Sequence, residues 1–237
     1  MSLRINSNVE AFNAHRQLVG TAANAAKSME RLSSGLRINR AADDAAGLAI
    51  SERLRAQSTG LGQAQRNAQD AVSMVQTAEG SLNTVHAMLQ RVRELAVQYK
   101  NGSNSVSDQT AIQSEVNQLA SEIERIGTSA EFNGIKLLSA SASISFQVGA
   151  NDGEIISVAT VSLGTAVGSA FAALTTTGTT DISEIDAAIS AVSTQRAEFG
   201  AVQNRLEHTL NNLATYQENL MASESRIRDV DMAAEMV

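Results

Sequence analysis

The feature that most limits the fold of this chain is the absence of proline from all 237 of its residues. Average usage is about 5%, so about a dozen prolines would be expected. Proline breaks the interior of a helix because it lacks an N–H group and clashes with the preceding turn. Very long, uninterrupted helices are therefore allowed at both ends of the chain.

Two long segments, residues 44–100 and 182–235, carry apolar residues at steps of seven. Within each segment a second series of mostly small or apolar residues, also at steps of seven, alternates with the first at spacings of four and three. A four-three alternation sustained over many turns is typical of coiled-coil helices. At 1.5 Å of rise per residue, the first helix would be about 85 Å long. We expect the two helices to pair in antiparallel directions. The expected seam consists of Leu54, Leu61, Val75, Leu82, Leu89, Val192, Phe199, Leu206, Leu213, Leu220 and Ile227.

Smaller elements are predicted around these two helices. Residues 3–32 form a weakly periodic helix that needs a partner surface, and residues 107–127 repeat the four-three pattern. Alternating apolar residues over about 131–165 predict a β-hairpin region, and residues 164–181, rich in Gly, Ala, Ser and Thr, predict a variable loop. The expected fold is mainly α, an elongated antiparallel helical rod. It is a coiled-coil bundle of three long helices plus an N-terminal helix, with a small β-hairpin region.

Short polar motifs predict where the elements begin and end. Gly35 marks a turn after the first helix. Asp43 and Asp44 suit the start of the second helix, where a carboxylate can accept hydrogen bonds from free backbone N–H groups. Asn133-Gly134 predicts a tight turn. Asp181 and Glu184 resemble a capping box that opens the last helix.

Composition argues against several classes of function. The chain has no cysteine, and therefore no disulfide, thiolate zinc site or cysteine nucleophile. Its net charge is −7 and no block of Lys or Arg stands out, so no nucleic-acid partner is expected. His15, His86 and His208 are far apart and no HExxH motif is present, so we expect no catalytic residue, no metal site and no cofactor.

The chain also lacks the apolar runs that direct proteins into membranes. No stretch of 18 apolar residues occurs, which argues against a membrane span. The N-terminus MSLRINSNVEAF has no positively charged start followed by an apolar region. A cleaved secretory signal is therefore not expected.

Several motifs, in order along the chain, resemble bacterial flagellin. They are LSSGLRINRAADDAAGLAISERLRAQ (Leu32 to Gln57), QTAEGSLNTVHAMLQRVRELAVQ (Gln76 to Gln98), EFNGIKLL (Glu131 to Leu138), FQVGANDGE (Phe146 to Glu154) and FGAVQNRLEHTLNNL…ENLMASESRIRDVDMA (Phe199 to Ala233). Only about 160–185 lacks such a motif. The resemblance implies a structural subunit of the flagellar filament rather than an enzyme, with the outer variable domains absent.

The resemblance also implies an organisation, a location and partners. Residues 1–43 would be an N-terminal filament-core segment and linker, and residues 44–237 a rod domain. The protein would be extracellular, a motility filament exported through the flagellar secretion channel. Its partners would be copies of itself, a flagellar export chaperone, the cap and hook-associated proteins, and Toll-like receptor 5. Flagellins continue past the RIRDVDMA motif, so we expect poor polymerisation if that segment is missing after Val237.

A receptor-binding stretch is implied by the same resemblance. Its expected residues are Gln90, Arg91, Glu94, Leu95, Gln98 and Glu115. Arg91 and Leu95 are one helical turn apart, so we expect them to project on one face. Taken alone, the spacing of Arg91 and Glu115 favours an ordinary solvated salt pair, and only the motif favours a receptor contact.

Three rival functions stay open, one of which is a pure binding ligand for an immune receptor. A hook–filament junction protein of the flagellum would share the terminal helical patterns. An enzyme, as in relatives with an inserted protease, would need a longer middle segment and the HExxH motif that this chain lacks.

Overall fold

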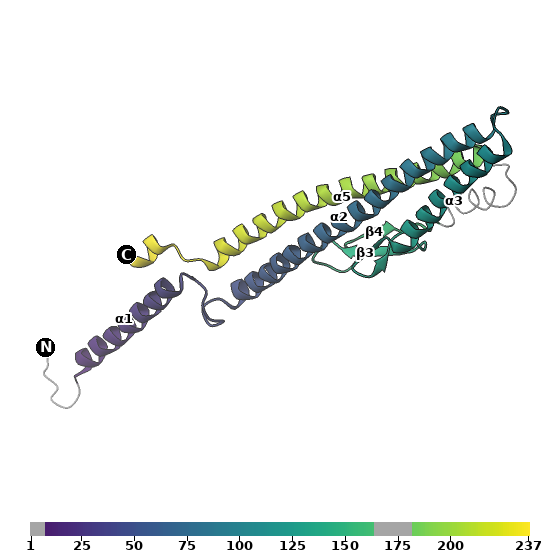
Figure 1. The fold of residues 1–237 in the computed structure, drawn as a ribbon. Helices are drawn as coiled ribbons and strands as arrows, with labels where there is room; N and C mark the ends of the chain where they lie inside the picture. The colour runs from purple at the N-terminus through teal and green to yellow at the C-terminus, as the bar shows by residue number, and fades with distance from the viewer. Residues whose placement is uncertain (1–7, 164–181) are drawn as a thin grey trace. The chain divides into compact units, whose positions relative to one another are not determined.

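A computed structural model describes residues 8–163 and 182–237 (Figure 1). Its helices are α1 (Val9–Ser34), α2 (Ala45–Tyr99), α3 (Val106–Ser129), α5 (Ile182–Arg228) and α6 (Met232–Met236). The expected fold, mainly α with three long helices, an N-terminal helix and a small β region, is confirmed. The loop expected at 164–181, with Asp181 of the expected capping box, lies outside the described residues.

The chain divides into two compact units. The first, here called the terminal unit, comprises residues 1–60 and 215–237, and the second, the central unit, comprises residues 61–214. Each unit contains a part of α2 and a part of α5.

In the central unit, α2 and α5 run in antiparallel directions side by side (Figure 1). Arg93 of α2 pairs with Asp186 of α5 at 2.6 Å, and Glu79 pairs with Arg196 at 3.5 Å. Residue numbers therefore rise along one helix as they fall along the other. The predicted seam residues of this unit face inward, since each is at most 8% exposed: Leu61, Val75, Leu82, Leu89, Val192, Phe199, Leu206 and Leu213.

α3 packs against the same pair of helices. Ile112 and Val116 of α3 share a buried cluster with Val92 and Leu95 of α2 and Ile185 of α5. The helix begins at Val106 because Ser105 and Asp108 form a reciprocal capping box, which satisfies two otherwise free N–H groups. The four-three pattern of the sequence therefore marks the buried face of α3.

Two antiparallel hairpins follow α3, where the sequence predicted a single hairpin region. The first pairs β1 (Glu131–Phe132) with β2 (Ile135–Lys136), and its turn has positive φ at Asn133 (49°) and Gly134 (77°). Asn and Gly adopt this conformation most readily, as predicted for a tight turn. The second pairs β3 (Ser143–Gln147) with β4 (Ile155–Ala159). Its inward residues, among them Val148 and Ile156, pack on Ala68 and Leu206.

In the terminal unit, α2 and α5 also run antiparallel. Glu52 of α2 accepts a hydrogen bond from Arg228 of α5 at 2.7 Å. The backbone carbonyl of Ser58 accepts a hydrogen bond from the side chain of Gln217 at 3.3 Å. Burial is thinner here. Leu220 is 8% exposed, whereas the outermost predicted seam residues, Leu54 and Ile227, are only half-buried.

The last helix ends earlier than the sequence predicted. α5 stops at Arg228 instead of about 235, and a short helix, α6, follows. The N–H of Val230 donates to the carbonyl of Gly35 at 3.1 Å, so the backbone leaves the helical pattern. Asp231 then accepts from the N–H groups of Ala233 and Ala234 as the cap of α6. Asp favours such caps over helix interiors because its short carboxylate competes for backbone N–H groups.

The helix α1 has clear signals at both ends. Asn8 caps its start by accepting from the N–H of Ala11 at 3.1 Å. Gly35 ends it in the left-handed conformation, with φ of 71°. At the next helix, Asp44 accepts from the N–H of Gly47 at 2.9 Å, which confirms the predicted cap of α2.

Candidate assembly and receptor-binding surfaces

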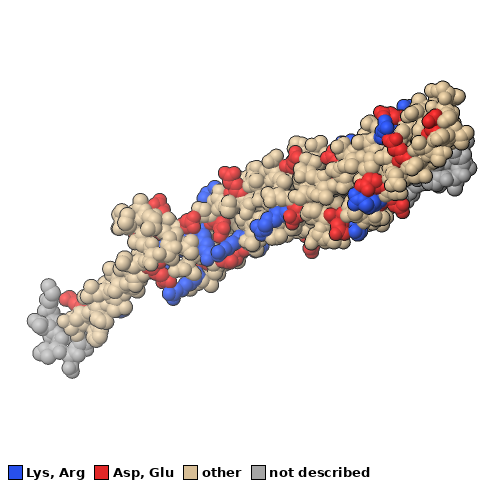
Figure 2. All heavy atoms as spheres, viewed as in Figure 1, with Lys and Arg blue, Asp and Glu red and all other residues tan. Residues whose placement is uncertain are grey.

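The helix α1 is the most exposed long element of the described chain. It has no buried residue, and Phe12, Leu18 and Met29 are 67%, 70% and 68% exposed. Figure 2 shows few charged side chains over α1. A helix that leaves large apolar side chains in water is marginally stable alone and is a candidate for binding another protein surface.

More broadly, the terminal unit holds most of the exposed apolar side chains. Among the described residues, eleven of the fifteen exposed large hydrophobic residues belong to this unit, and four belong to the central unit. The core residues show the opposite distribution, since Ile38 and Leu220 are the buried large hydrophobic residues of the described terminal unit. The terminal unit therefore keeps its apolar surface available for contacts outside itself.

Ion pairs hold α1 within the terminal unit. Lys27 pairs with Asp43 at 2.6 Å, and Glu30 pairs with Arg40 at 2.9 Å, so two adjacent turns of α1 are tied to the segment before α2. The hydrogen bond from Lys27, with those from the backbone of Arg40 and Asn39, lowers the pKa of Asp43 to about 2. Asp43 is therefore ionised at neutral pH and anchors the segment.

A third pair joins α1 to the end of the described chain. Arg31 donates to Glu235 of α6 at 3.3 Å, and the two side chains are only 25% and 18% exposed. α1 and α6 lie in contact in the same unit. Sequence reasoning missed this contact, although Lys27, Glu30 and Arg31 occupy neighbouring positions on one side of the helix end.

The predicted seam residues lie inside the subunit. From Leu61 to Leu89 and from Val192 to Leu220, those named in the seam are at most 8% exposed. Their side chains hold α2 and α5 of one copy together. They therefore build the subunit, and the surface for other copies has to be formed by other residues.

The receptor patch implied by the resemblance centres on Arg91. Its guanidinium donates to Glu115 of α3 at 2.9 and 3.0 Å and to Glu94 of α2 at 3.1 Å. The hydrogen bonds to Glu115, and secondarily to Glu94, raise the pKa of Arg91 above its ordinary value. The three side chains are 50%, 46% and 68% exposed, so the arrangement presents a fixed cation flanked by two carboxylates.

The remaining members of the expected patch differ in exposure. Gln90 and Gln98 are exposed, and the amide of Gln90 lies 3.0 Å from Nε2 of His86. Leu95 is 1% exposed and packs with Ile112, Val116 and Ile185. Arg91 and Leu95 therefore differ in exposure although they are one helical turn apart, because the side chain of Leu95 packs in the α2–α3–α5 core. In this conformation Leu95 supports the patch from below.

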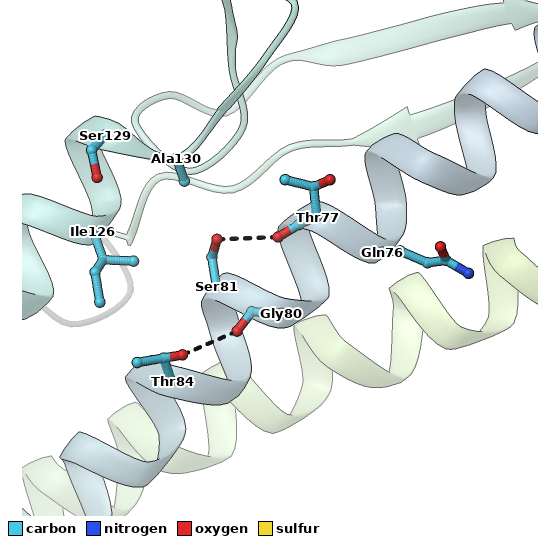
Figure 3. A pocket seen from close by; sticks show the side chains of 8 residues that line it. All are labelled: Gln76, Thr77, Gly80, Ser81, Thr84, Ile126, Ser129 and Ala130. Atoms are coloured by element: carbon cyan, nitrogen blue, oxygen red, sulfur yellow. Dashed lines mark hydrogen bonds between the residues drawn. The ribbon is translucent and has the colours of Figure 1, made fainter.

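Two features of the described residues bear on metal binding and catalysis. Within residues 8–163 and 182–237, no group of three His, Cys, Asp or Glu residues could hold a metal ion. A shallow groove of about 370 Å³ lies between α2 and the end of α3 (Figure 3). None of the eight residues that line it has a titratable side chain, and the hydroxyls of Ser81 and Thr84 donate back to the carbonyls of Thr77 and Gly80.

Two further features are the charge distribution of the drawn face and the hydropathy of the described helices. On the face drawn in Figure 2, Lys and Arg lie interspersed with Asp and Glu, and no broad basic patch is seen. Among the helices of the described chain, none combines the length and the apolar character required to cross a bilayer.

Known proteins match this chain over nearly its whole length. Two family models match, the bacterial flagellin N-terminal helical region over residues 5–143 and the bacterial flagellin C-terminal helical region over residues 182–237. The flagellin of Halalkalibacterium halodurans is 53% identical, over 98% of this chain and 88% of that protein. The flagellin of Bacillus subtilis is 46% identical, over 99% of this chain and 90% of that protein.

Solved structures agree with the fold. The crystal structure of Bacillus cereus flagellin matches with a TM-score of 0.56 and 32% identity, over 62% of this chain and 88% of that chain. A putative flagellar hook-associated protein from Vibrio parahaemolyticus matches with a TM-score of 0.53 but only 15% identity, which shows a shared fold alone. The rival interpretation as a hook–filament junction protein is therefore not favoured. With both terminal regions matched, the chain belongs to the bacterial flagellin family, structural subunits of the flagellar filament that are not enzymes.

Proposed function

We propose that this flagellin joins copies of itself through the exposed apolar surface of α1, building an extracellular filament that serves motility. The observation that carries the proposal is α1 itself, a helix of 26 residues without one buried residue. Its stability alone is marginal, because most helical stability in proteins comes from packing an apolar face. A second copy that covers this face supplies the missing contacts.

The size of the effect follows from two side chains. Phe12 and Leu18 are 67% and 70% exposed, so most of their apolar area is still available. Full burial of such a side chain contributes roughly 1.5–3 kcal/mol, which gives roughly 3–6 kcal/mol for the two together. Loss of even half of that amount would lower the affinity between copies by about tenfold or more.

The test is seeded elongation, in which the purified chain is added to fragments of flagellar filament and growth is followed by electron microscopy. We expect the double variant Phe12→Gln, Leu18→Gln to elongate seeds at least about tenfold more slowly than the parent chain. Gln is a good helix former and carries no charge, so α1 keeps its helical propensity.

The matched control is Val106→Gln, since Val106 is 81% exposed but belongs to the central unit. It should elongate seeds at the parent rate, and both variants should melt at the parent temperature. Equal elongation by the double variant and the parent chain would refute a role for α1.

Family membership supports the other expected partners and the route of export. A filament subunit must cross the cell envelope and reach the growing end, which requires an export chaperone, the secretion channel, and the cap and hook-associated proteins. The proposal includes transit without a cleaved signal peptide. Mass spectrometry of the exported chain should therefore recover the segment MSLRINS, with at most Met1 removed. Recovery of chains that all begin further along would contradict it.

A second function is proposed for the Arg91 patch, which is recognition by Toll-like receptor 5. Its support is the fixed geometry of Arg91, which Glu94 and Glu115 hold at 3.1 and 2.9 Å on the surface of α2 and α3. Arg residues set in such well-ordered positions are frequent hot spots of interfaces. Gln90 and Gln98 lie on the exposed side of α2, and Leu95 acts as support from the core.

The receptor proposal has a matched control two residues away. Arg93 is as exposed as Arg91 and also paired, with Asp186 at 2.6 Å, but a two-residue step along a helix points it in a different direction. Titration with the receptor ectodomain should show a loss of at least about 2 kcal/mol for Arg91→Ala and little change for Arg93→Ala. Equal affinities of the Arg91 variant and the parent would refute the proposal.

A further inference from the structure

The methionines divide sharply between the two units. Met29, Met221, Met232 and Met236 belong to the terminal unit and are 68%, 49%, 47% and 71% exposed. Met74 of the central unit is 2% exposed, and Met88 of the same unit is partly buried against the main core. Met1 lies outside the described residues.

Three of the exposed methionines lie on the elements that adjoin the proposed assembly surface. Met29 is on α1, and Met232 and Met236 are on α6. α1 and α6 are in contact, and the half-buried pair of Arg31 and Glu235 joins them at 3.3 Å. A contact made through α1 therefore brings these sulfur atoms close to the incoming copy.

Methionine at such a surface has a specific chemical liability. The thioether is apolar and flexible and fills irregular gaps between packed surfaces. A peroxide transfers one oxygen atom to the sulfur, which loses two electrons and becomes a sulfoxide, while the second oxygen of the peroxide leaves as water. The sulfoxide is polar and chiral, so burying it between two copies is unfavourable.

We propose that Met29, Met221, Met232 and Met236 are peroxide-sensitive modification sites, and that conversion of the three on α1 and α6 to sulfoxides stops a free subunit from joining a filament. The inference rests on the proposed function, since it concerns regulation of the same surface. A copy already in a filament is protected at the sulfur atoms that the contacts cover, so the block acts on unassembled subunits.

The first measurement maps the reaction. The free chain is treated with dilute hydrogen peroxide, and peptide mass spectrometry follows each methionine with time. We expect the four exposed methionines to be oxidised at least about tenfold faster than Met74, because reaction at sulfur requires access of the peroxide. Oxidation of Met74 as fast as the exposed four would overturn the proposed selectivity.

The second measurement links oxidation to assembly. The oxidised parent chain should elongate filament seeds at least about tenfold more slowly than the untreated chain, and treatment with the two methionine sulfoxide reductases should restore the rate. A variant with all four exposed methionines changed to Leu keeps the apolar volume and should remain within about twofold of its own untreated rate. Met74→Leu is the matched control and should stay as sensitive as the parent.

The outcomes separate this inference from the function on which it rests. If the untreated chain does not elongate seeds, the proposed assembly and its regulation both fail. If the untreated chain elongates seeds and oxidation leaves the rate unchanged, only the regulation fails. Equal loss of elongation in the four-Leu variant and in the parent would also overturn it, since the damage would then lie at other residues.

Discussion

Truncation of Leu206 to Ala tests the core of the central unit most sharply. Leu206 of α5 is fully buried, and its neighbours are Ala68 and Ala71 of α2 and Val148 and Ile156 of the second hairpin. Two of these neighbours are alanines on a long helix, so the surroundings cannot easily collapse into the space left behind. We therefore expect a loss of about 3 kcal/mol from the lost transfer energy and the cavity together.

For a unit of this size, that loss corresponds to a fall of about 6–12 °C in melting temperature. The assay is thermal unfolding followed by helical circular dichroism. The matched control is Leu18→Ala, which removes the same atoms from a side chain that is 70% exposed on α1, and its expected effect is within about 0.5 kcal/mol. Equal shifts for the two variants would refute the assignment of Leu206 to a packed core.

Three further predictions concern local contacts. Gly149→Ala should destabilise the chain by about 1–3 kcal/mol in a urea titration, because a Cβ there would overlap the side chain of Glu154, and an unchanged midpoint would contradict the close approach. Ser105→Ala should cost about 1 kcal/mol in the same assay through loss of the cap of α3, whereas parent-like stability would argue against that cap. The carboxyl carbon of Asp43 should titrate in NMR with a pKa of about 2 instead of 3.8, since the hydrogen bond from Lys27 favours the charged form. The contribution of Asp43 to stability is thus present above pH 3.8 and lost as the pH falls toward about 2, and a midpoint near 3.8 would contradict the pair.

Two kinds of feature can be predicted from the sequence: helix faces marked by a repeated apolar spacing, and turns whose backbone conformation favours one or two residue types. The seven-residue steps from Leu61 to Leu89 and from Val192 to Leu220 correctly mark the buried faces of α2 and α5. Asn133-Gly134 marks the first hairpin turn because few other residues adopt positive φ at low cost.

The features that escape prediction depend on tertiary contacts. α5 ends at Arg228 because the N–H of Val230 donates a hydrogen bond to the carbonyl of Gly35, which is nearly two hundred residues away in the sequence. The spacing of Leu95 from Arg91 is that of one helical turn, which by itself predicts that both project on one face but not how exposed each is. Only the position of α3 shows that Leu95 is covered, because Ile112 and Val116 of α3 pack against it.

The most direct test of α1 as the assembly surface is hydrogen exchange measured on free subunits and on filaments. With no buried residue in Val9–Ser34, its amides should exchange rapidly in the free subunit. In filaments we expect the same amides to exchange at least about a hundredfold more slowly, while those of the buried α2 segment near Val75 and Leu82 remain protected in both states. Equal exchange of the α1 amides in subunits and filaments would contradict its role in assembly.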